Sequence, residues 1–253
     1  MKTVRSFVAG AWLIALLLGV WELLSRGRIL DPLFFPAPST LLITLVSLTR
    51  GGILGRQVMY TVERTSAGFA LGLVCGVVSS AVISLFATLR RAAEPLIWVL
   101  YAVPRLTLLP MVMLLVGVND ASRILLIALG TALLMMIQIG DAVRTVNRDY
   151  VDMAVNYGAS RLTVIRKVYL PACLPQIFTA MRISFSRALV LTISVELLSS
   201  DNGLGNMIWN AWQTFAVEKL YVSVALAGAL GLLVQGFFIL LEKRLVPWKD
   251  GVA

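Results

Sequence analysis

The chain contains no histidine, only two cysteines and few charged residues. The absence of histidine removes the commonest metal ligand and the usual general base, which disfavours metal-dependent and hydrolytic active sites. Cys75 and Cys173 lie in or beside apolar stretches without the spacing of metal ligands or of a disulfide framework. The chain also lacks a G-x-x-x-x-G-K-[ST] phosphate loop. We therefore expect a non-catalytic protein that holds no cofactor or metal and does not hydrolyse ATP itself.

Charged residues make up 14% of the 253 residues and hydrophobic residues 59%, with a mean hydropathy of +0.88. Soluble domains average about 25% charged residues, so this chain has too little polar material to cover a globule of its size. Its apolar runs are long and unbroken, which favours helices over a barrel. The composition predicts an all-α, polytopic membrane protein with one transmembrane domain over residues 1–253. The net charge of +9 is more typical of cytoplasmic loops than of nucleic-acid binding.

Six apolar runs are long enough to cross a bilayer. They cover residues 7–24, 65–89, 96–118, 124–143, 177–198 and 220–241. The first run competes with a signal peptide, but its length and its ending at Trp21-Glu22 favour a retained span. Six spans put both termini on one side, and the basic loops at 90–94 and 144–175 assign that side to the cytoplasm.

Two further patterns concern packing. Between the first two runs, Pro36 and Pro38 precede a short apolar stretch that we expect to form a helix capped by Ser39, lying along the outer membrane surface. In the second run, small residues recur every fourth position and predict a close approach of another helix. They are Gly68, Gly72, Gly76, Ser80 and Ser84.

Residues 144–175 form the one polar island in the second half of the chain. Within it Tyr150, Met153, Ala154 and Tyr157 recur at helical spacing, which predicts a short helix with one apolar stripe. Gly158 stands where that helix is expected to end, because glycine enters the left-handed C′ conformation without a Cβ clash.

A second short helix is expected directly afterwards. Ser160 is placed to cap its first turn. We expect Leu170-Pro171 to end it, since proline disfavours the helical state in the preceding residue. Two short amphipathic helices joined by a fixed turn are too small to fold alone, so they need a partner surface.

This island resembles the cytoplasmic loop of permease subunits of ATP-binding-cassette importers, whose pattern is EAA-x3-G-x9-I-x-LP. The residues at the pattern's positions are Asp152, Met153, Ala154, Gly158, Val168, Leu170 and Pro171. Aspartate, methionine and valine replace the family's Glu, Ala and Ile. The runs FFPAPSTLL and EPLIWVLYAVPRLTLLPMVMLLVGV also resemble permeases for nitrate, sulfonates, taurine and thiamine precursors, so that the resemblance covers about residues 30–245.

The resemblance implies the permease fold of type I importers in a bacterial inner membrane. It implies two separate ATPase subunits that hold ATP and Mg, a second and identical permease copy, an extracytoplasmic solute-binding protein, and no nucleic acid. The ATPase-coupling residues that it implies are Asp152, Ala154, Gly158, Ser160, Leu170 and Pro171.

Three charged residues lie inside expected spans, where a charge costs at least about 2.5–3.5 kcal/mol. Arg105, Arg187 and Glu196 are therefore candidates for the translocation path. The last two match the resembling family's fifth span, and a structural Arg187–Glu196 ion pair is an equal alternative. Pro104 and Pro110 are expected to bend the third span, either as transport hinges or as structural kinks alone.

Other readings of the chain stay open at this point. The island also fits an ordinary connector between two spans, and Ala154-x3-Gly158-x5-Val164 fits a DNA-reading helix-turn-helix. A secondary transporter would need coupling carboxylates and related halves, and a membrane enzyme would need a reactive constellation. The sequence does not identify the solute.

Overall fold

The structure is a computed structural model that describes residues 2–246; residues 1 and 247–253, the ends of the expected domain, lie outside it. Side chains are described from residue 12 onward, except at positions 85 and 87. Every regular element in this part is helical, which confirms the all-α class. The elements are α1 (Lys2–Arg26), α2 (Pro38–Arg50), α3 (Ile53–Leu85), α4 (Ala87–Ala102), η1 (Arg105–Leu108), α5 (Leu109–Val116), α6 (Asp120–Arg144), α7 (Arg148–Asn156), α8 (Arg161–Val164), η2 (Ile165–Tyr169), α9 (Leu170–Ser199), α10 (Leu204–Gln213) and α11 (Val217–Leu245).

Four stretches of the described chain are helical, long enough and apolar enough to cross a membrane. They are Ile53–Ser84, Asp120–Arg144, Arg161–Ser199 and Val217–Leu245. A bent pair of helices, Thr88–Ala102 and Arg105–Val116, makes a fifth if it counts as one span. The expected sixth span falls on α1, whose side chains are described only from residue 12, so the count of six stays a prediction.

The expected third span, residues 96–118, is two helices with a corner between them. Thr88–Ala102 and Arg105–Val116 meet at 89°. Pro104 lies at the corner, where its fixed φ and missing N–H end helical hydrogen bonding. Pro110 lies in the first turn of α5, where proline is tolerated because that N–H has no helical partner. The structure therefore has the expected bend at Pro104, whereas Pro110 starts a helix and does not bend one.

The chain divides into two compact units, residues 1–60 with 196–228, and residues 61–195 with 229–253. In the first unit, Leu48, Leu54 and Val222 form the buried core. The expected Ser39 cap of α2 is wrong, because Pro38 occupies the start of the helix and moves the N-cap to Ala37. Instead Glu22 of α1 accepts from the Ser39 N–H at 3.0 Å and from its hydroxyl at 2.7 Å.

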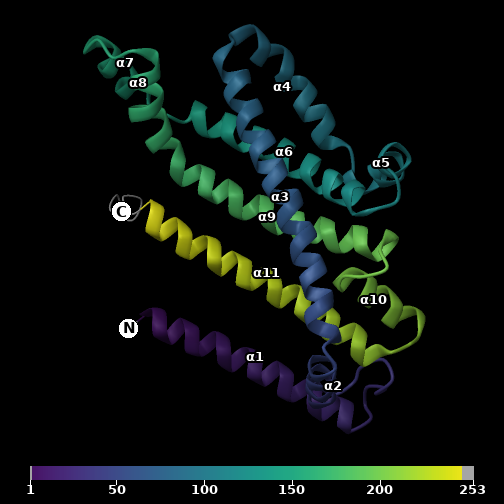
Figure 1. Cartoon of the computed structure of the whole chain (residues 1–253). Helices are drawn as coiled ribbons and strands as arrows, with labels where there is room; N and C mark the ends of the chain where they lie inside the picture. The colour runs from purple at the N-terminus through teal and green to yellow at the C-terminus, as the bar shows by residue number, and fades with distance from the viewer. Residues whose placement is uncertain (1, 247–253) are drawn as a thin grey trace. The chain divides into compact units, whose positions relative to one another are not determined.

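In the second unit, α3 and α6 pack along the expected small-residue stripe (Figure 1). A Cβ added to Gly68 would lie 2.6 Å from the Ile127 Cβ, and one added to Gly76 would lie 2.7 Å from the Met135 Cβ. A Cβ at Gly72 would overlap the Ala128 carbonyl. The predicted close approach is confirmed, and beside it Phe69, Ile127, Ala188 and Phe238 form a buried cluster.

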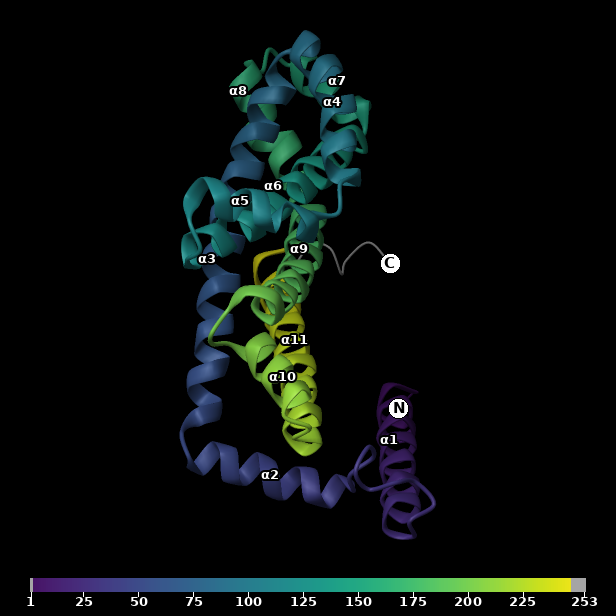
Figure 2. The same ribbon diagram turned by 90° about the vertical axis from the view of Figure 1, so that its right-hand side faces the viewer.

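The segment α7–α8 projects at the start of α9, at the same end of this unit as the α3–α4 turn (Figures 1 and 2). The expected basic loops near residues 90 and 144–175 thus lie at one end of the second unit.

Candidate functional site

The α7–α8 hairpin, which we define as residues 148–169, is fixed by its own turn. The Gly158 N–H donates to the Val155 carbonyl at 2.9 Å and the Ala159 N–H donates to the Ala154 carbonyl at 3.0 Å. With Gly158 at φ +76°, this is the Schellman arrangement, in which the left-handed residue follows the helix. The predicted role of Gly158 as a helix end is confirmed.

The second half of the hairpin begins as expected but does not end as expected. The Ser160 hydroxyl accepts from the Thr163 N–H at 3.3 Å and caps α8. The helix then passes through a π-turn at Ile165–Tyr169 into α9, with Leu170 in ordinary helical conformation. Leu170-Pro171 therefore does not stop the helix, and that prediction is wrong. The wider turn changes the hydrogen-bond register just ahead of Pro171, which is how a helix accommodates such a disruption.

The hairpin exposes large apolar side chains, which we call the hairpin face. Its members are Tyr150, Met153, Tyr157, Leu162 and Ile165. Tyr157 is 88% exposed, although it lies in a segment outside the apolar runs. Asp152 is also exposed beside them, and Ala154 is half-buried. Exposed apolar groups clustered on a polar segment are typical of a protein-docking surface.

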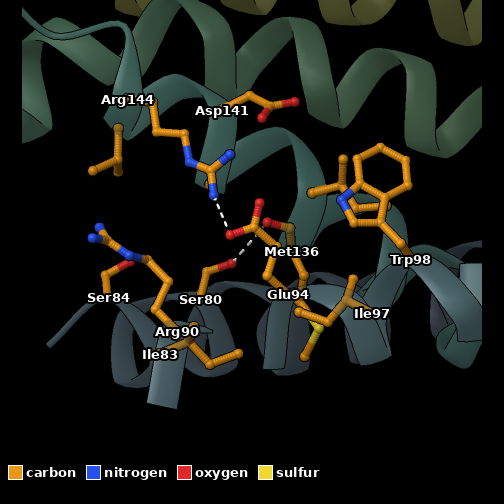
Figure 3. A pocket seen from close by; sticks show the side chains of 13 residues that line it. Ser80, Ile83, Ser84, Arg90, Glu94, Ile97, Trp98, Met136, Asp141 and Arg144 are labelled. Carbon is orange, nitrogen blue, oxygen red and sulfur yellow. Dashed lines mark hydrogen bonds and ion pairs between the residues drawn. The ribbon is translucent and has the colours of Figure 1, made fainter. Parts of the chain in front are cut away.

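The base of the hairpin is tied to the spans on both sides. The Gln176 Nε2 of α9 donates to the Thr145 Oγ1 at the end of α6 at 3.0 Å. Arg144, also at the end of α6, pairs with Glu94 of α4 at 2.6 Å. Figure 3 shows this pair at the edge of a pocket whose walls include Ser80, Ser84 and Trp98. These contacts connect α4, α6 and α9 beside the base of the hairpin.

Arg105 and Arg187 come together around one aromatic ring. The Arg105 guanidinium carbon lies 4.6 Å from the Tyr101 ring centroid. The Arg187 Nη1 donates to the Tyr101 hydroxyl at 2.6 Å. Both arginines line the same two hollows, one of which also contains Thr131. We refer to Tyr101, Arg105, Thr131 and Arg187 as the arginine cluster.

Glu196 has a separate environment. It is fully buried, and one of its carboxylate oxygens accepts from the Gly205 N–H at 3.1 Å, in the first turn of α10. A Cβ at Gly203, which has φ +101°, would overlap this carboxylate. A carboxylate at a helix N-terminus satisfies a free donor and complements the helix dipole. These contacts favour a structural role for Glu196.

Sequence reasoning missed Tyr101 and Thr131. Tyr101 lies at the end of α4 and Arg105 follows the Pro104 corner, so their contact depends on that corner and not on helical spacing. Thr131 carried no local signal either, because it reaches the cluster through the packing of α6.

Comparison with known proteins gives consistent relatives. The aliphatic sulfonates transport permease protein SsuC of Bacillus subtilis is 28% identical over 96% of this chain and 88% of its own length. The taurine transport system permease protein TauC of Escherichia coli is 27% identical over 94% and 89%. The nitrate import permease protein NrtB of Leptolyngbya laminosa is 26% identical over 97% and 90%.

Solved structures share the fold. A structure of the MetNI methionine ABC transporter matches with a TM-score of 0.70 at 18% identity, covering 78% of this chain and 97% of that chain. A bacterial ABC transporter involved in alginate import matches with a TM-score of 0.66 at 15% identity, covering 97% and 99%. The expected type I importer permease fold is thus confirmed.

Residues 68–247 match the family described as "Binding-protein-dependent transport system inner membrane component". This stretch contains the α7–α8 hairpin, the arginine cluster and the spans that connect them. It favours neither a DNA-binding regulator nor a secondary transporter. The chain therefore belongs to the binding-protein-dependent inner-membrane component family and is the multi-pass permease subunit of an ABC importer.

Proposed function

We propose that this permease carries a small oxyanion of the sulfonate, taurine or nitrate type, driven by separate ATPase subunits that dock on the α7–α8 hairpin. The proposal is carried by the hairpin face, whose apolar side chains are exposed on a segment held rigid by Gly158. The solute class is supported by the names of the sulfonate, taurine and nitrate relatives. In this proposal the permease is non-catalytic and the ATPase subunits hold ATP and Mg.

In the proposed mechanism, Asp152 and the basic residues of the hairpin set the orientation of docking, while the hairpin face supplies buried apolar area. Gly158 keeps the angle between α7 and α8. Closure of the ATPase pair moves the hairpin, and the continuous helix from Arg161 to Ser199 carries that movement into the spans. Because Leu170-Pro171 lies within this helix, its role in the proposed mechanism is to shape the connection between α8 and α9.

We propose two identical permease copies with the termini and the hairpin on the cytoplasmic side, and a solute-binding protein outside. Arg187 supports the second copy, because its side chain is exposed within a span. A charged side chain at that depth faces a water-filled path or another protein surface. The path between two copies meets this requirement.

The test is co-expression of the permease with the ATPase and binding-protein subunits, followed by reconstitution in proteoliposomes. ATP-dependent uptake of taurine, an alkanesulfonate or nitrate is the expected result. A wild-type complex that assembles without the α7–α8 hairpin face in contact, judged by cysteine crosslinking from Tyr157, would contradict the coupling scheme. Uptake of none of the three anions would contradict the solute class.

A further inference from the structure

The arginine cluster has no carboxylate counter-ion among the described residues that line its hollows. Two guanidinium nitrogens of Arg105, Nε and Nη2, are buried and have no hydrogen-bond partner among the described residues. The Thr131 hydroxyl is buried and unpartnered in the same sense. No aspartate or glutamate is among the described residues that line the two hollows. Buried N–H and O–H donors without an acceptor are costly, so these groups favour an acceptor from outside the chain.

The same unit contains a contrasting pair of buried arginines. Arg64 Nε donates to Asp120 at 2.9 Å, and Arg123 pairs with the same carboxylate. These two arginines therefore have a counter-ion within the chain. Within the part of the chain that the structure describes, no carboxylate lines either hollow beside Arg105.

The surroundings of Arg105 hold its guanidinium in place. The Tyr101 ring lies against one side. Gly130 leaves room for the arginine stem, because a Cβ there would lie 2.8 Å from the Arg105 Cδ. Arg187 is fixed to the Tyr101 hydroxyl through one nitrogen, so that two cations converge on one tyrosine from different helices.

We propose that the arginine cluster is an oxyanion-binding site in the translocation path, with Arg105 and Arg187 as charged donors and Thr131 as a neutral donor. This inference rests on the proposed function and adds the residues that contact the solute. Planar guanidinium groups present paired N–H donors that match the oxygens of a sulfonate or nitrate group. The ligand is therefore a small solute that carries an anionic group with at least two terminal oxygens.

The direct test measures binding to the full chain in lipid nanodiscs, without ATPase subunits. Methanesulfonate and nitrate are the probes, and dimethyl sulfone is the uncharged control of similar shape. Saturable binding of the anions is expected, without binding of the sulfone. Arg105→Gln and Arg187→Gln should each weaken anion binding about tenfold or more, as loss of a hydrogen bond from a charged group does.

Two variants guard against a trivial result. Arg182→Gln removes a positive charge from the same helix at a residue that lines neither hollow, and binding should remain within about twofold. Arg105→Lys keeps the charge but loses the planar fork, and an intermediate affinity is expected. Size-exclusion profiles that match the wild type establish that each variant is folded.

The outcomes separate this inference from the proposed function. Absence of saturable anion binding, or equal losses of anion affinity in Arg182→Gln and Arg105→Gln, overturns the proposed oxyanion-binding site. Normal sulfonate uptake by complexes carrying Arg105→Gln and Arg187→Gln also overturns it, while leaving the proposed function intact. Anion binding that needs both arginines, in a complex that takes up no anion, supports the oxyanion-binding site and contradicts the proposed solute class.

Discussion

The α7–α8 hairpin exposes large apolar side chains such as Tyr157, whereas two guanidinium nitrogens of Arg105 in the arginine cluster are buried. Each region reverses the usual distribution of polarity in a membrane protein. Exposed apolar side chains are typical of a surface that binds another protein, and unpaired cationic donors are typical of a site that binds an anion. The two regions differ as well in how they are assembled. The hairpin is fixed by contacts between near neighbours, whereas the cluster needs α4, η1, α6 and α9 together.

The largest effect should come from breaking the hairpin at its turn. Gly158→Val places a β-branched residue at φ +76°, where side chains of L-residues are strained by about 1–3 kcal/mol. The angle between α7 and α8 should be lost, so that uptake falls to background while membrane insertion stays normal. Proteoliposome uptake and membrane-fraction blots measure the two. Gly158→Asn, which tolerates this conformation, should retain most uptake, and full activity of the valine variant would disprove a fixed turn.

The next effect concerns the hairpin face itself. Tyr157→Ser removes the most exposed of its large side chains without touching a buried contact. Burying such a side chain contributes about 1.5–3 kcal/mol, so affinity for the ATPase subunit should fall about 10- to 100-fold. The measurement is the dissociation constant of purified ATPase subunit and permease held in nanodiscs. Tyr157→Phe is the control and should bind nearly as the wild type; equal affinities for both variants would remove the face from the interface.

A third change tests the arginine cluster alone. Gly130→Ala puts a methyl group 2.8 Å from the Arg105 Cδ, so Arg105 must move. Oxyanion affinity should fall several-fold, whereas ATPase binding at the hairpin should not change. Gly140→Ala on the same helix is the matched control, because nothing lies within 4 Å of its added Cβ. Anion binding that is the same in both variants would show that the position of Arg105 is unimportant.

The smallest effect is expected where the two regions are linked. Glu94 and Arg144 pair at 2.6 Å, but their side chains are 40% and 49% exposed. Exposed ion pairs contribute little to stability, so a double-mutant cycle of Glu94→Gln and Arg144→Gln should give a coupling energy close to zero. Thermal or denaturant unfolding of the detergent-solubilised protein provides the measurement. A large coupling energy would mean that water is excluded from the pair.

Sequence reasoning succeeded where structure depends on nearby residues. The roles of Gly158 and Ser160 follow from turn and capping chemistry within about four residues, and both were predicted. The small-residue stripe on α3 was predicted for the same reason, since a four-residue period defines one helix face. The all-α membrane-protein class was predicted from the composition and from the long, unbroken apolar runs.

Sequence reasoning failed where the outcome depends on backbone geometry or on partners that the residue pattern does not specify. Leu170-Pro171 was expected to end a helix, but the π-turn ahead of it lets the helix continue. Ser39 was expected to act as a cap, yet the acceptor is Glu22 from another helix. Glu196 was expected to belong to the path or to pair with Arg187; it accepts from Gly205 beyond a left-handed glycine, a contact that was not predicted, and its path role stays a prediction. None of these partners is set by a local spacing.

The uninterrupted helix from Arg161 to Ser199 has a geometric consequence for transport. At about 1.5 Å per residue, its 39 residues form a rod of about 58 Å, and Arg187 lies about 39 Å along it. Tilting such a rod by about 5° at the hairpin displaces the Arg187 backbone by about 3 Å, comparable to the length of one hydrogen bond. In the proposed mechanism, a small tilt at the hairpin would therefore be enough to make or break a hydrogen bond between Arg187 and a bound anion.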